Sequence, residues 1–133
     1  MSSETSKILV AEDNPALAGV VRFNLERAGF DVTLAANGRE AWEIAEHEAF
    51  DLIVTDQQMP EMTGIELCQQ LRHAEMHAKT PVVMLTAKGL ELDRQALRDE
   101  LKVVDVLPKP FSPFELVQTI EKCLASSVGP SQA

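Results

Sequence analysis

The sequence predicts an α/β fold in which five parallel strands form a single doubly wound sheet with helices on both faces. Short apolar runs alternate with segments whose apolar residues recur at helical spacing, and this alternation is typical of a parallel sheet with right-handed crossovers. Polar or charged residues directly follow four of the apolar runs, as expected where parallel strands end at one edge of a sheet. The 133 residues are enough for one domain with its own core.

The first strand and the first helix have clear boundaries. The apolar run Ile8–Ala11 predicts a buried first strand over Lys7–Ala11. Asn14 is a favourable N-cap residue and Pro15 suits the first helical position, so we expect a helix to begin there. Apolar residues then recur at helical spacing until Gly29, a residue typical of helix ends.

The next segment predicts an edge strand, a helix and a central strand. Asp31–Ala35 alternates between polar and apolar residues, whereas Leu52–Thr55 is apolar throughout and is expected near the centre of the sheet. Between these strands, Asn37-Gly38 is a turn signal. One face of a second helix is then marked by Ala41, Trp42, Ile44 and Ala45.

The pattern continues in the second half of the chain. A loop from Asp56 to Gly64 precedes a third helix, whose apolar residues fall within Ile65–Leu71. Val82–Leu85 predicts the fourth strand, and Leu90–Leu101 is helical by propensity and charged on most of its surface.

The last strand and helix complete the predicted domain. Val103–Leu107 is the fifth strand, Ser112 is expected to cap the last helix, and Pro113 suits its first position. We expect residues 1–125 to form the domain and residues 126–133 to form a flexible tail, because the tail is small, polar and contains Gly and Pro.

Charge and composition exclude several classes of function. The net charge of −9 argues against binding to nucleic acid. The first residues lack the order of a signal peptide and the apolar runs are too short to span a membrane, so no membrane partner is expected and a cytoplasmic location is the default. Cys68 and Cys123 have neither metal-site nor disulfide spacing and are expected to be reduced and to face the core.

The polar residues after the predicted strands indicate a magnesium and phosphoryl site. They are Glu12, Asp13, Asp56, Thr86 and Lys109. Asp13 and Asp56 are hard oxygen ligands for Mg²⁺, with Glu12 acting through a coordinated water. Asp56 is the candidate nucleophile toward phosphorus, while Lys109 offers a charge and Thr86 a hydroxyl to phosphoryl oxygens. The strand order 2-1-3-4-5 is favoured because it makes Asp13 and Asp56 neighbours.

Four segments resemble the receiver domains of bacterial two-component response regulators, of the chemotaxis-receiver type. These segments, in the family's order and spacing, are Ile8–Asn14, Asp56–Gly64, Val82–Ala87 and Pro108–Phe111. The resemblance covers residues 7 to about 125 and implies a flavodoxin-like (βα)5 fold with strand order 2-1-3-4-5.

The resemblance also implies a role for each site residue. Asp56 would accept the phosphoryl group, Thr86 would move toward it as the switch hydroxyl, and Lys109 would pair with it. A cis peptide bond is implied between Lys109 and Pro110. The residues implied for Mg²⁺ are Glu12, Asp13, Asp56 and the backbone carbonyl of Gln58.

By the same resemblance the protein is a phosphorylation-dependent signalling switch. It would receive its phosphoryl group from a sensor histidine kinase or a histidine phosphotransfer protein and change its contact surface for an unknown output protein. It would not be an enzyme beyond its own phosphoryl transfer and dephosphorylation. A homodimer through the fourth helix, fifth strand and last helix is implied by analogy alone.

The chain departs from the family pattern in three places, the first of which is Glu12, where aspartate is commoner in the family. Val106 stands where the family usually has Tyr or Phe, an aromatic residue whose rotamer change accompanies activation. Lys102 and Val103 replace the Gly-Ala that commonly opens the fifth strand. We therefore expect the coupling between Thr86 and the surface to differ from the usual one.

Two alternative functions can be compared with the hypothesis of a signalling switch. An unphosphorylated receiver-like interaction module stays open because of Val106, although every site residue is retained. A phosphohydrolase of the haloacid dehalogenase type would need Asp-x-Asp after the first strand, where this chain has Glu12-Asp13-Asn14. No output domain is expected after Leu124, so the chain is either a stand-alone receiver or part of a larger regulator.

The remaining notable side chains are expected to be structural. His73 and His77 are four residues apart, a spacing that can bind zinc, but no third ligand accompanies them, and both are expected at a solvent-exposed helix end. His47 is expected at the surface, Trp42 to be partly buried, and Met59 to pack under the loop beside the site.

Overall fold

The computed structural model describes residues 5–87 and 92–128, and strands alternate with helices along it. The strands pair in parallel as one sheet in the order β2-β1-β3-β4-β5, which confirms the predicted fold class and strand order. The strands are β1 (Lys7–Ala11), β2 (Asp31–Ala35), β3 (Leu52–Asp56), β4 (Val82–Thr86) and β5 (Val103–Pro108). The helices are α1 (Pro15–Arg27), α2 (Gly38–Ala45), α3 (Gly64–His73), the 3-10 helix η1 (Glu75–His77), α4 (Arg94–Leu101) and α5 (Pro113–Val128).

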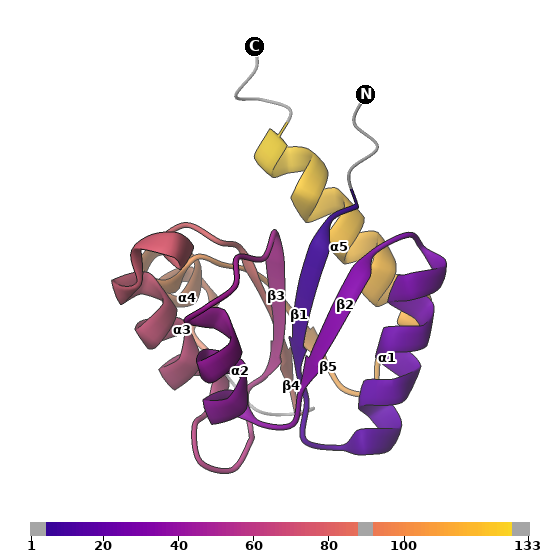
Figure 1. Cartoon of the computed structure of the whole chain (residues 1–133), viewed down its shortest axis with the longest axis horizontal. Helices are drawn as coiled ribbons and strands as arrows, with labels where there is room; N and C mark the ends of the chain where they lie inside the picture. The colour runs from indigo at the N-terminus through magenta and orange to yellow at the C-terminus, as the bar shows by residue number, and fades with distance from the viewer. Residues whose placement is uncertain (1–4, 88–91, 129–133) are drawn as a thin grey trace.

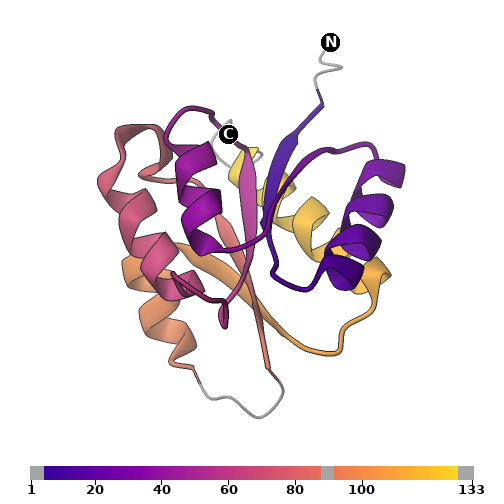
Figure 2. The same cartoon turned by 60° about the horizontal axis from the view of Figure 1, so that its bottom comes forward.

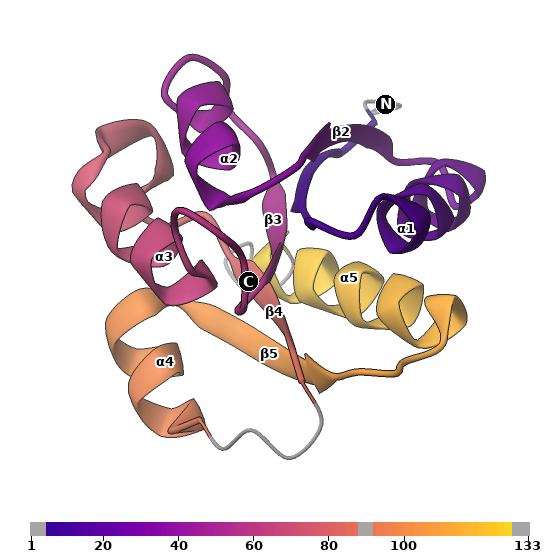
Figure 3. The same ribbon diagram turned by 90° about the horizontal axis from the view of Figure 1, so that it is seen from below.

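Helices cover both faces of the sheet (Figure 1). α1 and α5 lie together on one face, and α2, α3 and α4 lie on the other (Figure 3). Each face buries its own apolar cluster: Leu9 and Ala11 of β1 belong to one cluster, and Ile8 and Val10 belong to the other. Because successive side chains of β1 enter opposite clusters, this strand is apolar at every position from Ile8 to Ala11.

The strand order places the ends of β1 and β3 side by side. In the paired register Ala11 lies opposite Thr55, so the residues that follow β1 are next to the last residue of β3. The carboxyl ends of the strands come forward in Figure 2. This edge, where the strand order reverses, is the part of the fold in which side chains from distant parts of the sequence can meet.

Two helices are capped by the side chains that the sequence predicts. Asn14 Oδ1 accepts hydrogen bonds from the backbone N–H groups of Ala16 (3.0 Å) and Leu17 (3.2 Å) at the start of α1. Ser112 Oγ accepts one from the N–H of Glu115 (3.0 Å) at the start of α5. These bonds satisfy donors that have no partner within the helix.

The predicted start of the fourth helix is wrong. The sequence predicts a helix from Leu90, but α4 begins at Arg94, and residues 88–91 lie outside the described part of the chain. Asp93 is the N-cap, because its carboxylate accepts a hydrogen bond from the N–H of Ala96 (3.0 Å). The backbone of Asp93 is extended and its side chain caps the helix, so α4 begins at Arg94 even though propensity alone would allow an earlier start.

The predicted exposure of His77 is also wrong. Its ring is fully buried, with Nδ1 3.1 Å from Thr80 Oγ1. Nε2 lies 3.0 Å from the carbonyl oxygen of Ala45 and 3.1 Å from that of Glu48. Because both neighbours of Nε2 are acceptors, we assign a proton to this nitrogen. His77 therefore joins η1 to the end of α2.

Other side chains lie where the sequence predicts. His47 and His73 are exposed, Trp42 is partly buried, and Met59 is buried. Both cysteines are free thiols.

The last helix, α5, continues to Val128, past the predicted end of the domain, and residues 129–133 lie outside the described part of the chain. Within residues 5–87 and 92–128, no helix combines the length and the apolar character needed to cross a bilayer.

Candidate functional site

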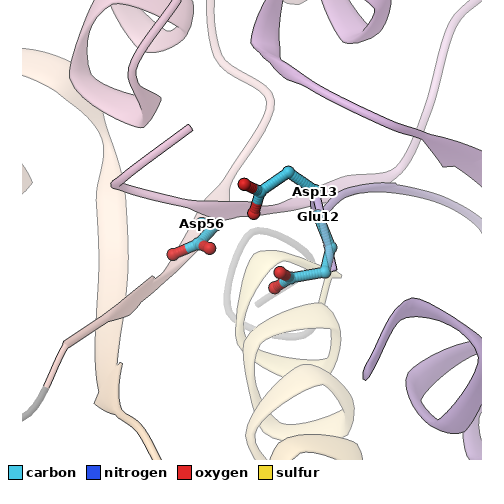
Figure 4. A group of neighbouring side chains, drawn as sticks. All are labelled: Glu12, Asp13 and Asp56. Atoms are coloured by element: carbon cyan, nitrogen blue, oxygen red, sulfur yellow. The ribbon is translucent and has the colours of Figure 1, made fainter. Parts of the chain in front are cut away.

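The polar residues that follow the strands meet at the carboxyl edge of the sheet. Glu12 and Asp13 follow β1, Asp56 ends β3, Thr86 ends β4, and Lys109 follows β5. One carboxylate oxygen from each of Glu12, Asp13 and Asp56 can be chosen so that all three lie within 4.8 Å of one another. Figure 4 shows these three side chains converging from the ends of two strands. The convergence that the sequence predicts is present.

The carboxylates differ in their contact with water. Glu12 and Asp56 are 2% and 4% exposed, whereas Asp13 is exposed. The main chain positions Glu12, whose N–H donates to the carbonyl oxygen of Ala35 (3.0 Å). Its Oε2 in turn accepts a hydrogen bond from the N–H of Asn14 (3.1 Å). The site thus has two sheltered carboxylates and one open to solvent.

Lys109 is the cation of this site. Its Nζ donates a 2.8 Å hydrogen bond to Asp56 Oδ2 and lies 3.3 Å from Glu12 Oε1. The backbone N–H of Lys109 donates to the carbonyl oxygen of Thr86 (2.7 Å), and the Lys109–Pro110 peptide bond is cis, as the sequence resemblance implies. Burial opposes the charge of Lys109, but the hydrogen bond and charge of Asp56, together with the charge of Glu12, raise its pKa above the ordinary value. Lys109 is therefore a fixed positive charge.

Glu12 has an unusual environment for a carboxylate. Burial raises the pKa of Glu12 above its ordinary value, and the negative charge of Asp56 acts in the same direction. The hydrogen bond from the Asn14 N–H and the charge of Lys109 oppose this shift. Among the described residues, the buried Oε1 atom has no hydrogen-bond partner with suitable geometry.

These features fit a hard divalent cation. The donor set consists of carboxylate oxygens, which Mg²⁺ prefers, and a buried oxygen without a hydrogen bond can be satisfied by a metal-bound water. The exposed Asp13 leaves one side of the site open to solvent, as needed for an ion that keeps several waters.

Thr86 offers a free hydroxyl at the same edge. The residue is 3% exposed, and within the described part of the chain its Oγ1 atom has no hydrogen-bond partner. A buried hydroxyl without a partner is costly, so it gains from any acceptor that enters the site. Val106, on the neighbouring strand, is buried in the same apolar cluster as Met84 and Leu97. It fills part of the core, and no aromatic ring stands at its position.

The loop after Asp56 lies against the start of α3. Gln58 is exposed and Met59 is buried within this loop. A Cβ added to Gly64 would lie 2.6 Å from the carbonyl oxygen of Asp56, so only glycine permits this close approach.

Two further contacts were missed by sequence reasoning: the bond from the Asn14 N–H to Glu12, and the bond from the Ile65 N–H to the side chain of Gln57 (2.8 Å). No local pattern marks either contact.

Comparison with known proteins gives one consistent result. A family model for the response regulator receiver domain matches residues 8–121. The alkaline phosphatase synthesis transcriptional regulatory protein PhoP of Bacillus subtilis is 43% identical over 121 residues, which are 91% of this chain and 49% of that protein. The CpxR homolog of Haemophilus influenzae, also a transcriptional regulatory protein, is 40% identical over 95% of this chain and 53% of its own length. The chain spans about half the length of the curated relatives it matches.

Solved structures agree with this match. The chemotaxis response regulator CheY4 of Vibrio cholerae superposes with a TM-score of 0.81 at 31% identity, covering 90% of this chain and 98% of that one. The receiver domain of the sensor histidine kinase PA1611 from Pseudomonas aeruginosa, with a magnesium ion in its active-site cleft, superposes with a TM-score of 0.80 at 32% identity. That match covers 92% of this chain and 99% of the PA1611 domain.

Proposed function

Because this chain belongs to the receiver domains of two-component response regulators, we propose that Asp56 accepts a phosphoryl group and that the phosphorylated form is the signalling state. The observation that carries the proposal is the arrangement around Asp56. Its carboxylate is sheltered from solvent, hydrogen-bonded to Lys109 at 2.8 Å, and close to two further carboxylates. This combination of oxygen ligands, nucleophile and fixed cation is suited to phosphoryl transfer.

The reaction is a transfer to a carboxylate oxygen. An oxygen of Asp56 attacks the phosphorus of a phosphohistidine, a P–O bond forms, and the P–N bond breaks with its electron pair left on the imidazole nitrogen, which takes up a proton. Lys109, already in contact with Asp56, would then bind a phosphoryl oxygen. The unpartnered hydroxyl of Thr86 would donate to another.

The residues that would hold Mg²⁺ are Asp13, Asp56 and the backbone carbonyl of Gln58, with Glu12 bound through a water. Bound there, the ion would offset the repulsion between the carboxylates and the incoming phosphoryl oxygens. The magnesium ion in the PA1611 receiver domain supports this assignment by analogy.

The proposed phosphoryl donor is a sensor histidine kinase or a histidine phosphotransfer protein. The named relatives are transcriptional regulatory proteins of about twice this length, so a regulator with a further output domain is one context in which this receiver would act. For the output surface, we propose a homodimer that forms through α4, β5 and α5. Apart from transferring and losing its own phosphoryl group, the domain is proposed to have no enzymatic activity.

Intact mass after incubation with acetyl phosphate tests the proposal. We expect the protein to gain the mass of one phosphoryl group when Mg²⁺ is present, and to gain none when Mg²⁺ is removed by a chelator. The Asp56→Asn variant should gain none in either condition, because an amide is not a nucleophile for this transfer.

Asp99→Asn is the matched control. Asp99 is an exposed residue of α4 whose carboxylate accepts a hydrogen bond from the side-chain amide of Gln95, so this variant should be labelled like the wild type. If a bona fide receiver is labelled in parallel and this protein is not, the chain is an unphosphorylated interaction module. Labelling that persists in Asp56→Asn would place the acceptor elsewhere.

A further inference from the structure

Gln57 is the acceptor for the first two N–H groups of α3. The Gly64 N–H donates to the backbone carbonyl of Gln57 (3.0 Å), and the Ile65 N–H donates to its side-chain Oε1 (2.8 Å). The next donors of the helix are satisfied by Thr63, whose hydroxyl accepts from the Glu66 N–H at 3.1 Å. The first turn of α3 is therefore fully hydrogen-bonded, and Gln57 supplies two of the acceptors from seven and eight residues earlier.

Gln57 is itself held by the sheet. Its N–H donates to the carbonyl oxygen of Leu85 (2.8 Å), which extends the β3–β4 ladder by one residue. One residue thus connects the end of β3, the end of β4 and the start of α3. A Cβ on Gly64 would lie 3.0 Å from Gln57 Cα and 3.1 Å from Gln57 Oε1, so the two ends of the loop are in tight contact.

We propose that Gln57 is a positioning residue for the magnesium and phosphoryl site. It stands between Asp56 and Gln58, the two residues of this loop that are proposed as metal ligands. The hydrogen bonds of its main chain and side chain fix the backbone from which both ligands project. A ligand set that is already in place before the ion arrives binds it without first ordering the loop, and this raises affinity. This inference rests on the proposed function.

Two substitutions separate the hydrogen bond from the space that the side chain fills. Gln57→Met keeps the length of the side chain but removes the acceptor, whereas Gln57→Glu keeps an oxygen acceptor. In metal-free protein, the Ile65 amide proton should exchange with solvent about tenfold faster in Gln57→Met than in wild type, and Gln57→Glu should retain protection. Exchange is measured by NMR or mass spectrometry and does not depend on the metal.

The second readout is the dissociation constant for Mg²⁺ from titration calorimetry. Gln57→Met should bind Mg²⁺ about two- to tenfold more weakly than wild type, the ratio that corresponds to one hydrogen bond of ordinary strength. Gln57→Glu should bind at least as tightly as wild type, because the acceptor is retained and a negative charge is added. Gln69→Met, at an exposed position of α3, is the matched control and should behave as wild type in both measurements.

The outcomes are distinct. Wild-type affinity for Mg²⁺ in Gln57→Met overturns the inference while leaving the proposed function intact, even if the Ile65 amide exchanges faster. Equal weakening in Gln57→Met and Gln57→Glu also overturns it, because the acceptor would then be irrelevant. A wild type that neither binds Mg²⁺ nor accepts a phosphoryl group overturns both. If Gln57→Met does not fold, Gln57→Asn replaces it, since its amide is one carbon too short to reach the Ile65 N–H.

Discussion

Lys102 adopts a backbone conformation that side chains disfavour. As the C-cap of α4 it has φ 60° and ψ 32°, in the left-handed region, and its N–H donates to the carbonyl of Leu97. The family pattern has glycine here, and the observed conformation supplies the physical reason.

We expect Lys102→Gly to raise the free energy of unfolding by about 0.5–1 kcal/mol, because relief of the left-handed strain exceeds the added flexibility of the unfolded chain. Urea denaturation measures the change. Lys102→Ala removes the charge but keeps the Cβ atom, so it should stay within about 0.5 kcal/mol of wild type. An equal gain in both variants would assign the effect to charge.

Cys68 makes stability depend on pH. It is fully buried, and burial raises the pKa of its thiol from the usual 9.0 to about 12. At pH 7 the thiol is protonated in both states, whereas at pH 10 it ionises in the unfolded chain and stays protonated in the folded one. The folded state therefore loses stability as the pH rises above the ordinary thiol value.

Between pH 7 and pH 10 this group should contribute a loss of about 1.4 kcal/mol in the free energy of unfolding. The measurement compares denaturation of wild type and Cys68→Ala at both pH values, and the variant should show a smaller loss by that amount. Parallel pH profiles would mean that Cys68 is accessible to water in the folded state.

At the scale of elements, Arg72 joins the ends of several segments. Its guanidinium donates to the carbonyl oxygens of Leu101 at 2.8 Å, His77 at 2.6 Å and Thr80 at 2.7 Å. α3 is thereby connected to the end of α4, to η1 and to the residues that lead into β4. Burial lowers the pKa of Arg72 below its ordinary value, although the group stays charged.

Replacing Arg72 by Met should lower the free energy of unfolding by about 2–4 kcal/mol, because it removes three charge-assisted hydrogen bonds and keeps most of the apolar stem. Arg98→Met, at an exposed position of α4, should change it by less than about 0.5 kcal/mol. Thermal or urea unfolding of the two variants makes the comparison. Similar small effects in both would mean that water replaces the Arg72 bonds without loss.

Elements that depend on local sequence could be predicted, and those that depend on distant partners could not. The limits of β1 and β2 and the caps at Asn14 and Ser112 follow from neighbouring residues, and the structure confirms them. His77 was misplaced because its burial depends on the carbonyl groups of Ala45 and Glu48, about thirty residues earlier. The spacing of apolar residues along the sequence does not predict such a contact.

At the scale of the whole molecule, the site could be predicted because the topology forces it. Once the sheet is parallel and β1 lies beside β3, residues that follow these strands must meet, whatever the details of packing. The bonds that hold the meeting residues, such as those of Gln57 and the Asn14 N–H, depend on side-chain geometry and loop conformation. The sequence therefore predicts the position of the site but not how it is held rigid.

Gathering carboxylates at this edge should also make the stability of the whole fold depend on Mg²⁺. In the folded state one carboxylate oxygen from each of Glu12, Asp13 and Asp56 lies within 4.8 Å of the other two, whereas in the unfolded chain Asp56 is separated from Glu12 and Asp13. An ion that binds the folded state alone adds RT ln(1 + [Mg²⁺]/Kd) to the free energy of unfolding, which is about 1.4 kcal/mol per tenfold rise above the Kd. Urea denaturation over a series of MgCl₂ concentrations should show this slope.

Asp13→Asn separates specific binding from general screening of charge. This variant loses one proposed ligand and part of the repulsion, so without Mg²⁺ it should be at least as stable as wild type, and the slope with MgCl₂ should largely disappear. NaCl at matched ionic strength screens exposed charges over the whole surface but supplies no ion that binds specifically at this cluster. It should therefore not reproduce the wild-type slope. An equal rise in NaCl, or an unchanged slope in Asp13→Asn, would mean that the carboxylates do not form a magnesium site. The slope would then reflect the net charge of −9.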